Sequence, residues 1–134
     1  MDAIKKVNLL EILEGQPPRS NFHVIEVDQR YTVRVAKVAG RFPWHFHPHG
    51  VEGWFVFEGR LRIDTEKGAI DLERGDFATI PRGQRHSPEA LLPNTIVIIF
   101  NLRELGMVLD DPHAELGGFK ERDITRSERQ DQKL

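Results

Sequence analysis

The sequence predicts an all-β domain, a sandwich or barrel preceded by a short helix. Eight short runs rich in β-branched or aromatic residues follow one another along the 134-residue chain. Turn residues separate most of them at intervals of about 8–12 residues, as in sandwiches and barrels. Glycine (11) and proline (8) interrupt the chain too often for long helices. A chain of this length fits a single domain.

The first expected element is the short helix. Asn8 is a suitable N-cap, and Glu11 lies three positions later, where its side chain can reach back to the cap. Residues 9–13 supply apolar side chains for packing. Gly15 followed by Pro17-Pro18 ends the helix.

The strands follow the helix in close succession. They are predicted over Phe22–Val27, Tyr31–Ala39, Trp44–His47, Trp54–Phe57, Leu61–Thr65, Ala69–Leu72, Phe77–Ile80 and Thr95–Leu102. The turns between them are assigned to Asp28–Arg30, Glu58–Gly59, Glu66–Gly68 and Glu73–Gly75.

One predicted strand is apolar on both faces. Residues Ile96–Phe100 are all apolar, so this strand is expected to be buried on both sides. In a small barrel its outer face then needs a cover, which is either the N-terminal helix or a second subunit. We expect a homodimer, in which the second subunit provides that cover.

The composition excludes several kinds of site and partner. Cysteine is absent, which rules out disulfides, thiolate metal ligands, iron–sulfur clusters and cysteine nucleophiles. A net charge of −2 without a basic stripe argues against nucleic acid as a partner. The longest apolar run is far shorter than the ~18 residues of a membrane helix, and no apolar signal segment opens the chain. We therefore expect a soluble, cytoplasmic protein with no membrane partner.

Three of the six histidines lie within five positions. Residues two apart in a strand point to the same face, so His45 and His47 present two imidazoles side by side. Taken alone, such a pair is more often incidental than a ligand pair. The chain is expected to turn at Pro48–Gly50, which brings Glu52 beside the imidazoles on the next strand. His49 falls in this turn, and we expect it to be exposed or to lie at the rim of a pocket. The alternative is that His49 replaces Glu52 beside the imidazoles.

A second segment adds one more histidine. A short strand ends at a turn that contains Pro81 and Gly83. Proline fixes its own φ angle, and glycine permits the backbone angles of a tight turn. Such a turn swings His86 back toward the first pair. His23 and His113 lie outside both segments and are expected to be ordinary surface residues.

The first of these segments resembles a conserved motif of the cupin superfamily. Gly40, His45-x-His47, Glu52 and Gly59 stand in the family's order. The spacer after Gly40 is one residue shorter than in the family pattern.

The other segment resembles the second cupin motif. It matches the pattern from Gly75 through Pro81-x-Gly83 to His86, and it has Ala90 where the family has asparagine. Neither departure touches a ligand position. The resemblance implies a cupin or jelly-roll β-barrel over residues 19–110. An N-terminal segment with the short helix (1–18) precedes the barrel and a charged C-terminal tail (111–134) follows it.

The resemblance also implies a metal site made of His45, His47, Glu52 and His86. Three neutral imidazoles and one carboxylate suit Fe(II), Mn(II), Ni(II), Co(II) or Zn(II). Four side-chain ligands leave two positions of an octahedral ion open for a substrate or dioxygen. We expect one divalent transition metal per chain, with Fe(II) favoured.

Strand parity selects further candidates for the pocket. Gln84 shares the parity of His86, and Phe42, Trp44 and Trp54 are candidates for an aromatic wall, with core packing as the alternative. Seven arginines are potential partners of an anionic substrate: Arg34, Arg41, Arg60, Arg62, Arg82, Arg85 and Arg103. Most are expected at the surface, and one or two inside the mouth would favour a carboxylate or phosphate substrate.

Three kinds of function are compatible with this sequence. Cupins similar to this chain include metalloenzymes, and with iron we favour a dioxygenase-type oxidation of a small organic acid or aromatic. An isomerase or lyase that acts on a sugar or sugar acid is the non-redox alternative. A non-catalytic barrel that binds a metal or small molecule is the second hypothesis, and an oligomerisation module is the third.

Overall fold

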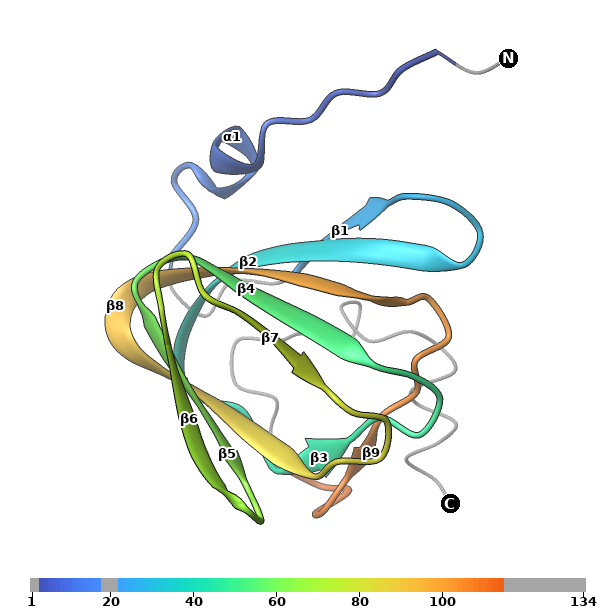
Figure 1. Ribbon diagram of the computed structural model, residues 1–134. Helices are drawn as coiled ribbons and strands as arrows, with labels where there is room; N and C mark the ends of the chain where they lie inside the picture. The colour runs from blue at the N-terminus through green and yellow to red at the C-terminus, as the bar shows by residue number, and fades with distance from the viewer. Residues whose placement is uncertain (1–2, 18–21, 115–134) are drawn as a thin grey trace.

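The predicted all-β fold and its short N-terminal helix are confirmed. The computed structural model describes residues 3–17 and 22–114. Most of them form one curled antiparallel sheet, and helix α1 (Leu9–Leu13) lies outside it (Figure 1). From residue 115 on, the predicted C-terminal tail lies outside the described residues.

Nine strands make up the sheet. They are β1 (His23–Glu26), β2 (Tyr31–Arg41), β3 (His45–Phe46), β4 (Glu52–Glu58), β5 (Arg60–Thr65), β6 (Gly68–Glu73), β7 (Phe77–Ile80), β8 (His86–Leu102) and β9 (Val108–Leu109). Every predicted strand is present, with ends that differ by a few residues at most sites. Strand β9 and the first half of β8 were not predicted.

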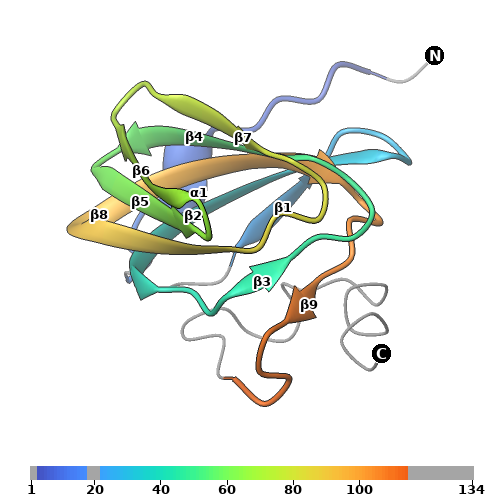
Figure 2. The same cartoon turned by 60° about the horizontal axis from the view of Figure 1, so that its bottom comes forward.

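Strand β8 joins the two walls of the barrel. Its first half pairs with β5 and β3, and its second half lies between β2 and β4. It curls from one wall to the other (Figures 1 and 2). Prolines in the first half hide this strand from a sequence pattern, because proline cannot donate to a ladder. Pro88 still takes part through its carbonyl oxygen, which accepts from the Phe42 N–H at 2.8 Å.

Strand alternation decides which side chains fill the barrel. On β2, Ala36 and Val38 face inward and pack in the main core with Trp54, Val56 and others. Val35 lies between them in sequence and faces outward. Polar residues of β2 that lie an even number of positions from Ala36 therefore also face inward.

Helix α1 covers part of the outer face. Asn8 Oδ1 accepts from the Glu11 N–H at 3.1 Å, so the predicted N-cap forms. Leu13 is 1% exposed against Val35 and Ile98, a burial that contributes about 1.5–3 kcal/mol. The helix therefore covers the strand at Ile98, whereas Phe100 stays 44% exposed.

No helix within the described residues is long and apolar enough to span a membrane.

Candidate metal centre

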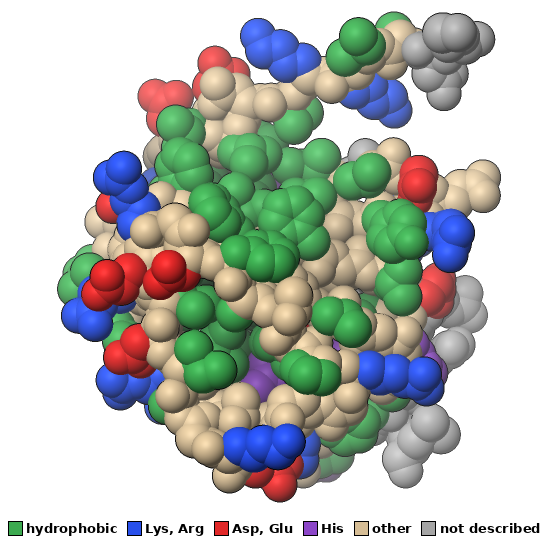
Figure 3. Space-filling model, viewed as in Figure 1, with side chains coloured by type: hydrophobic (Ala, Val, Ile, Leu, Met, Phe, Trp, Pro, Cys, Tyr) green, Lys and Arg blue, Asp and Glu red, His purple; other side chains and the backbone are tan. Residues whose placement is uncertain are grey.

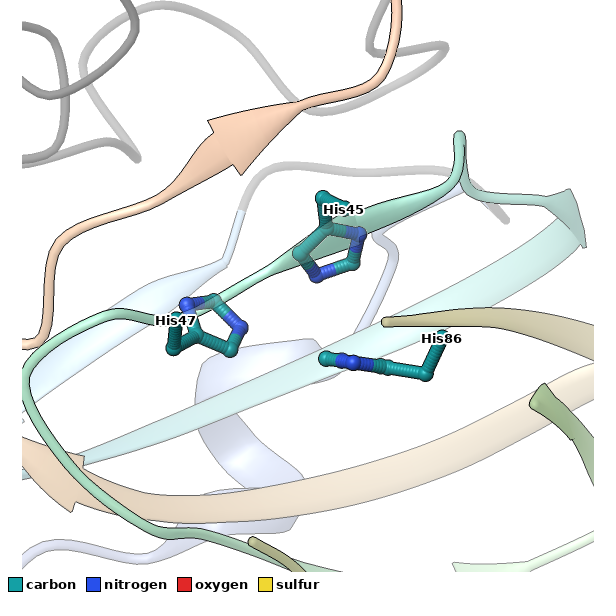
Figure 4. A group of neighbouring side chains, drawn as sticks. All are labelled: His45, His47 and His86. Atoms are coloured by element: carbon teal, nitrogen blue, oxygen red, sulfur yellow. The ribbon is translucent and has the colours of Figure 1, made fainter. Parts of the chain in front are cut away.

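The fold brings three of the four predicted ligands into one cluster. His45 on β3 pairs directly with His86 at the start of β8, and His47 follows His45 by two residues on the same face. One ring nitrogen from each lies within 4.8 Å of the others. All three rings are buried, and they converge in Figure 4. Segments 39 or more positions apart in sequence thus meet at one point.

A tight turn positions His86. Gly83 adopts φ +81°, the left-handed conformation that glycine takes without strain. Its N–H donates to the His47 carbonyl at 3.0 Å, and the Gln84 N–H donates to the Pro81 carbonyl at 3.1 Å. The predicted turn therefore links the second motif to the backbone of the first.

The protonation of the imidazoles follows from their partners. Each Nδ1 lies at hydrogen-bonding distance from a main-chain carbonyl oxygen: His45 with Pro43 at 2.7 Å, His47 with Gly106 at 2.7 Å and His86 with Gln84 at 2.9 Å. A carbonyl oxygen only accepts, so each Nδ1 carries a proton and donates it. In the neutral ring, Nε2 then keeps its lone pair for a ligand. These three carbonyl oxygens have no side-chain signal, so sequence analysis missed them.

Glu52 lies beside two of these rings. Its Oε2 is 3.3 Å from His47 Nε2, and its Oε1 is 3.5 Å from His86 Nε2. Trp54 stands two residues along β4 on the same face and donates its indole N–H to Oε1 at 2.6 Å. The indole thereby holds Oε1, and both carboxylate oxygens face the cluster.

Burial and neighbouring charges set the protonation states. Burial lowers the pKa of His45 well below its usual range, and the adjacent His86 and His47 lower it further. Burial alone would raise the pKa of Glu52. The neighbouring imidazoles, His47 before His86, outweigh it and hold that pKa well below the usual range. A neutral His45 and an ionised Glu52 are the states in which these groups bind metals.

These residues fit a divalent transition metal. His86 Nε2 is buried and makes no hydrogen bond within the described part of the chain, although a buried ring nitrogen ordinarily has a partner. The chemistry of the donors agrees, since three imidazole nitrogens beside a carboxylate suit iron, manganese, cobalt, nickel or zinc.

The predicted pocket residues occupy different places. Phe42 is half-buried, with its ring edge-on to His45 at 4.8 Å between centroids. Trp54 is 5% exposed in the core, so it combines core packing with its hydrogen bond to Glu52. The Trp44 ring lies under the Arg85 guanidinium at 5.4 Å.

Gln84 and His49 do not join the imidazole cluster. The Gln84 side-chain amide donates to the Arg85 carbonyl at 3.1 Å, and its own carbonyl oxygen is the group that contacts His86. His49 is exposed in the turn after β3, and its N–H donates to the Leu105 carbonyl at 3.1 Å. The structure therefore gives no support to His49 as the alternative to Glu52.

The seven arginines differ clearly in how far they are buried. Arg34 is 8% exposed on β2, and the other six are exposed or half-buried. Arg41 and Arg62, for example, form ion pairs with Asp64 and Asp71 on the outside of the barrel. Alternation along β2 is the signal that distinguishes Arg34, because it shares the parity of the inward-facing Ala36.

Comparison with protein families places this architecture among known proteins. Residues 31–99 match the model of the cupin domain family. Over 84 residues the chain is 38% identical to the uncharacterized protein YdbB of Bacillus subtilis (strain 168). That alignment covers 61% of this chain and 74% of YdbB.

Solved structures share the fold. A cupin-2 domain containing protein from Shewanella frigidimarina is 29% identical, with a TM-score of 0.67 over 72% of this chain and 94% of its own. A hydroquinone 1,2-dioxygenase from Sphingomonas sp. TTNP3, solved with 4-hydroxybenzoate bound, is 15% identical. Its TM-score is 0.57 over 76% of this chain and 80% of its own. At that identity the likeness concerns the fold alone.

Proposed function

The chain belongs to the cupin family, and from that premise we propose that it is a metal-dependent enzyme that oxidises a small organic acid or aromatic. One divalent metal, with Fe(II) favoured, is held by His45, His47 and His86, and Glu52 is the fourth ligand through Oε2. Two other functions compete with this proposal. One is a non-catalytic barrel that binds a metal or small molecule, and the other is an isomerase or lyase that acts on a sugar acid.

One observation carries this proposal. All three Nδ1 atoms are engaged by main-chain carbonyl oxygens, and the three buried rings offer nitrogens within 4.8 Å of one another. Ordinary core histidines have no reason to present three lone pairs to one point. Hydrogen bonds from the distal ring nitrogen are the usual means by which proteins orient metal-binding imidazoles.

The chain's own groups tune such a site. The Glu52 carboxylate offsets part of the metal's charge, and the Trp54 indole fixes its orientation. Burial of the rings at 6% exposure or less keeps bulk water away from them. A divalent metal bound there supplies Lewis acidity toward a substrate oxygen and, if it is iron, redox chemistry.

The choice of substrate class rests on the surroundings of the site. Figure 3 shows apolar side chains gathered on one face of the molecule, with some histidine surface among them. The Phe42 ring against His45 adds an aromatic contact. A flat organic molecule with an oxygen donor suits such surroundings. The hydroquinone 1,2-dioxygenase of similar fold was solved with 4-hydroxybenzoate bound, which supports an aromatic acid as a candidate.

The test measures metal content first and oxygen uptake second. We expect about one equivalent of metal per chain after purification with Fe(II), Mn(II), Ni(II) or Zn(II) supplied separately. We expect the Fe(II) protein to consume oxygen with a hydroxybenzoate or a hydroquinone. The His86→Ala variant is the negative control, and His49→Ala is the matched positive control.

Each alternative has its own result. Full metal binding without oxygen uptake, together with turnover of a sugar acid by the Mn(II) or Ni(II) protein, would favour the isomerase or lyase. Full metal binding without any turnover would favour the binder. Failure to take up any of these metals would refute the metal-dependent function.

A further inference from the structure

The wall of the barrel is open between β6 and β7. Strand β6 is hydrogen-bonded to β5 and strand β7 to β4, and the described residues form no ladder between β6 and β7 themselves. The two strands diverge from their common turn in Figures 1 and 2. Residues of β5, β6, β7 and the turn before β8 line a cavity of about 330 Å³ at this opening. Small-molecule sites have volumes of about 300–1,000 Å³. We call this cavity the β6–β7 pocket.

The inner end of the β6–β7 pocket borders the imidazole cluster. Thr65 lines the pocket and is the direct strand partner of His86. Ile80 also lines it and is the direct strand partner of Glu52. Opposite residues of an antiparallel pair project from the same face of the sheet, with Cβ atoms about 4.5–5.5 Å apart. A molecule in this pocket therefore lies beside the residues assigned to a metal.

The walls of the pocket are mainly apolar. Ile63 and Ile70 are direct partners on β5 and β6, and Leu72 lies two positions beyond Ile70 on the same face. Leu72 is 5% exposed in the core, whereas Ile70 is 56% exposed. Ala78 on β7 gives the opposite wall a small side chain. The inner face of β6 is thus covered at one end and open at the other, which suits a flat apolar ring.

Lys67 is the one charged residue in the described lining of the pocket. It lies in the turn between β5 and β6, where its N–H donates to Thr65 Oγ1 at 3.1 Å. The adjacent Glu66 pairs with Arg85 at 3.1 Å. The Lys67 ammonium forms no ion pair within residues 3–17 and 22–114. The pocket therefore has a positive charge at its mouth that an anionic ligand can neutralise.

We propose that the β6–β7 pocket is the substrate site and that it takes an aromatic acid with a single ring. The inference rests on the proposed function, because it assigns the place and the charge of that enzyme's substrate. The ring contacts Ile63, Ile70 and Ala78, and an oxygen substituent at one end of the ring points to the imidazole cluster. The carboxylate at the other end pairs with the Lys67 ammonium. This orientation keeps the carboxylate near water, where a charge need not be buried.

The experiment measures binding by calorimetry to the Zn(II)-loaded full chain, which is redox-inert and does not oxidise the acid. The probes are 4-hydroxybenzoate and its neutral analogue 4-hydroxybenzamide. At low salt we expect the acid to bind about threefold to fivefold more tightly than the amide, because an exposed ion pair makes a modest contribution. In about 1 M salt this difference should disappear, because salt screens exposed charges.

Two variants test the residues, each with a matched control. Ile70→Trp fills the mouth and should weaken the acid and the amide alike, by at least about tenfold, through steric exclusion. Leu92→Trp adds the same bulk at a 45% exposed strand position outside the pocket and should change neither affinity. Lys67→Met should bring the acid to the affinity of the amide and leave the amide unchanged. Lys6→Met, at an exposed lysine outside the pocket, should change neither affinity.

Two results would overturn the proposal. One is failure of the acid to bind the wild-type chain, or equal affinity for the acid and the amide at low salt, whether or not the variants fold. The other is unchanged affinity in a folded Ile70→Trp protein. Metal content and thermal unfolding are recorded for every variant, so that loss of metal is distinguished from a blocked pocket.

Failure of the proposed function gives different results. If the acid binds as expected and the Fe(II) protein consumes no oxygen, the pocket is supported and the oxidation is refuted. If the chain takes up no metal, the same probes are titrated into the metal-free protein. There the effects of Ile70→Trp and Lys67→Met still decide whether the pocket binds an aromatic acid.

Discussion

The Trp54 indole N–H donates to Glu52 Oε1 at 2.6 Å, and the two residues stand two positions apart on one face of β4. The strand itself therefore supplies both the carboxylate and the group that orients it. Both oxygens lie beside the imidazole cluster, and Oε2, which the indole does not engage, is the oxygen we assign to a metal.

Trp54→Phe tests this orientation. The variant keeps an aromatic ring in the core and removes the indole N–H, so the Glu52 carboxylate loses its fixed direction. We expect metal affinity to fall by about 10-fold to 100-fold, with a loss of about 1–3 kcal/mol in the free energy of unfolding. Competition titration with a chelator measures the affinity. Trp44→Phe is the control, and an equal effect of both variants would contradict the assigned role.

His86→Ala should strip the metal from the protein, and His49→Ala should not. His86 is fully buried in the imidazole cluster, whereas His49 is exposed in the turn after β3. Metal content and far-UV circular dichroism of both variants check the expectation. Loss of metal in His49→Ala with retention in His86→Ala would reverse the assignment.

Glu52→Gln tests whether the Glu52 carboxylate is a metal ligand or only alters the charge at the metal site. The amide keeps the shape of the side chain and loses the negative charge, so we expect weaker metal binding and a more acidic metal-bound water. The pH dependence of metal content measures the effect. If Glu52→Gln binds metal as tightly as the wild type, the three imidazoles suffice and the carboxylate is not a ligand.

The metal-free protein should lose stability on mild acidification. The pKa of His45 is held well below its usual range, chiefly by burial. Between that lowered pKa and the ordinary value of about 6.5, the unfolded chain therefore binds the proton and the folded chain does not. Stability is complete above about pH 6.5 and falls as the pH drops below it. Urea unfolding of the metal-free chain between pH 8 and pH 5 measures this slope, which His45→Gln should flatten.

We also propose that the chain forms a homodimer through aromatic residues on the outer face. Phe57, Phe77 and Phe100 are 40%, 54% and 44% exposed. Burying such side chains against a second copy would remove apolar area from water. Sedimentation should give twice the 15.4-kDa mass of the chain, and Phe77→Glu should give the single mass. A wild-type monomer at micromolar concentration would contradict the proposal.

The metal-binding candidates and most strands were predictable because their signals are local. His45 and His47 share a face by two-residue periodicity, and the Pro81 and Gly83 turn leads directly to His86. The Asn8 cap is equally local, since its partner lies three residues away. Such features depend on backbone angles and near neighbours, which a sequence states directly.

The tertiary structure alone decided what faces the site across the barrel. Alternation along β2 places Arg34 on the same face as Ala36, but only the curl of β8 between two walls makes that face the inside of the barrel, level with Trp54. The first half of β8 was hidden because its prolines break the strand pattern, although strand pairing tolerates them. The carbonyl of Gly106 that fixes the His47 ring comes from 59 residues away. Contacts of this kind arise from strand register and chain closure, and a sequence read along its length records neither.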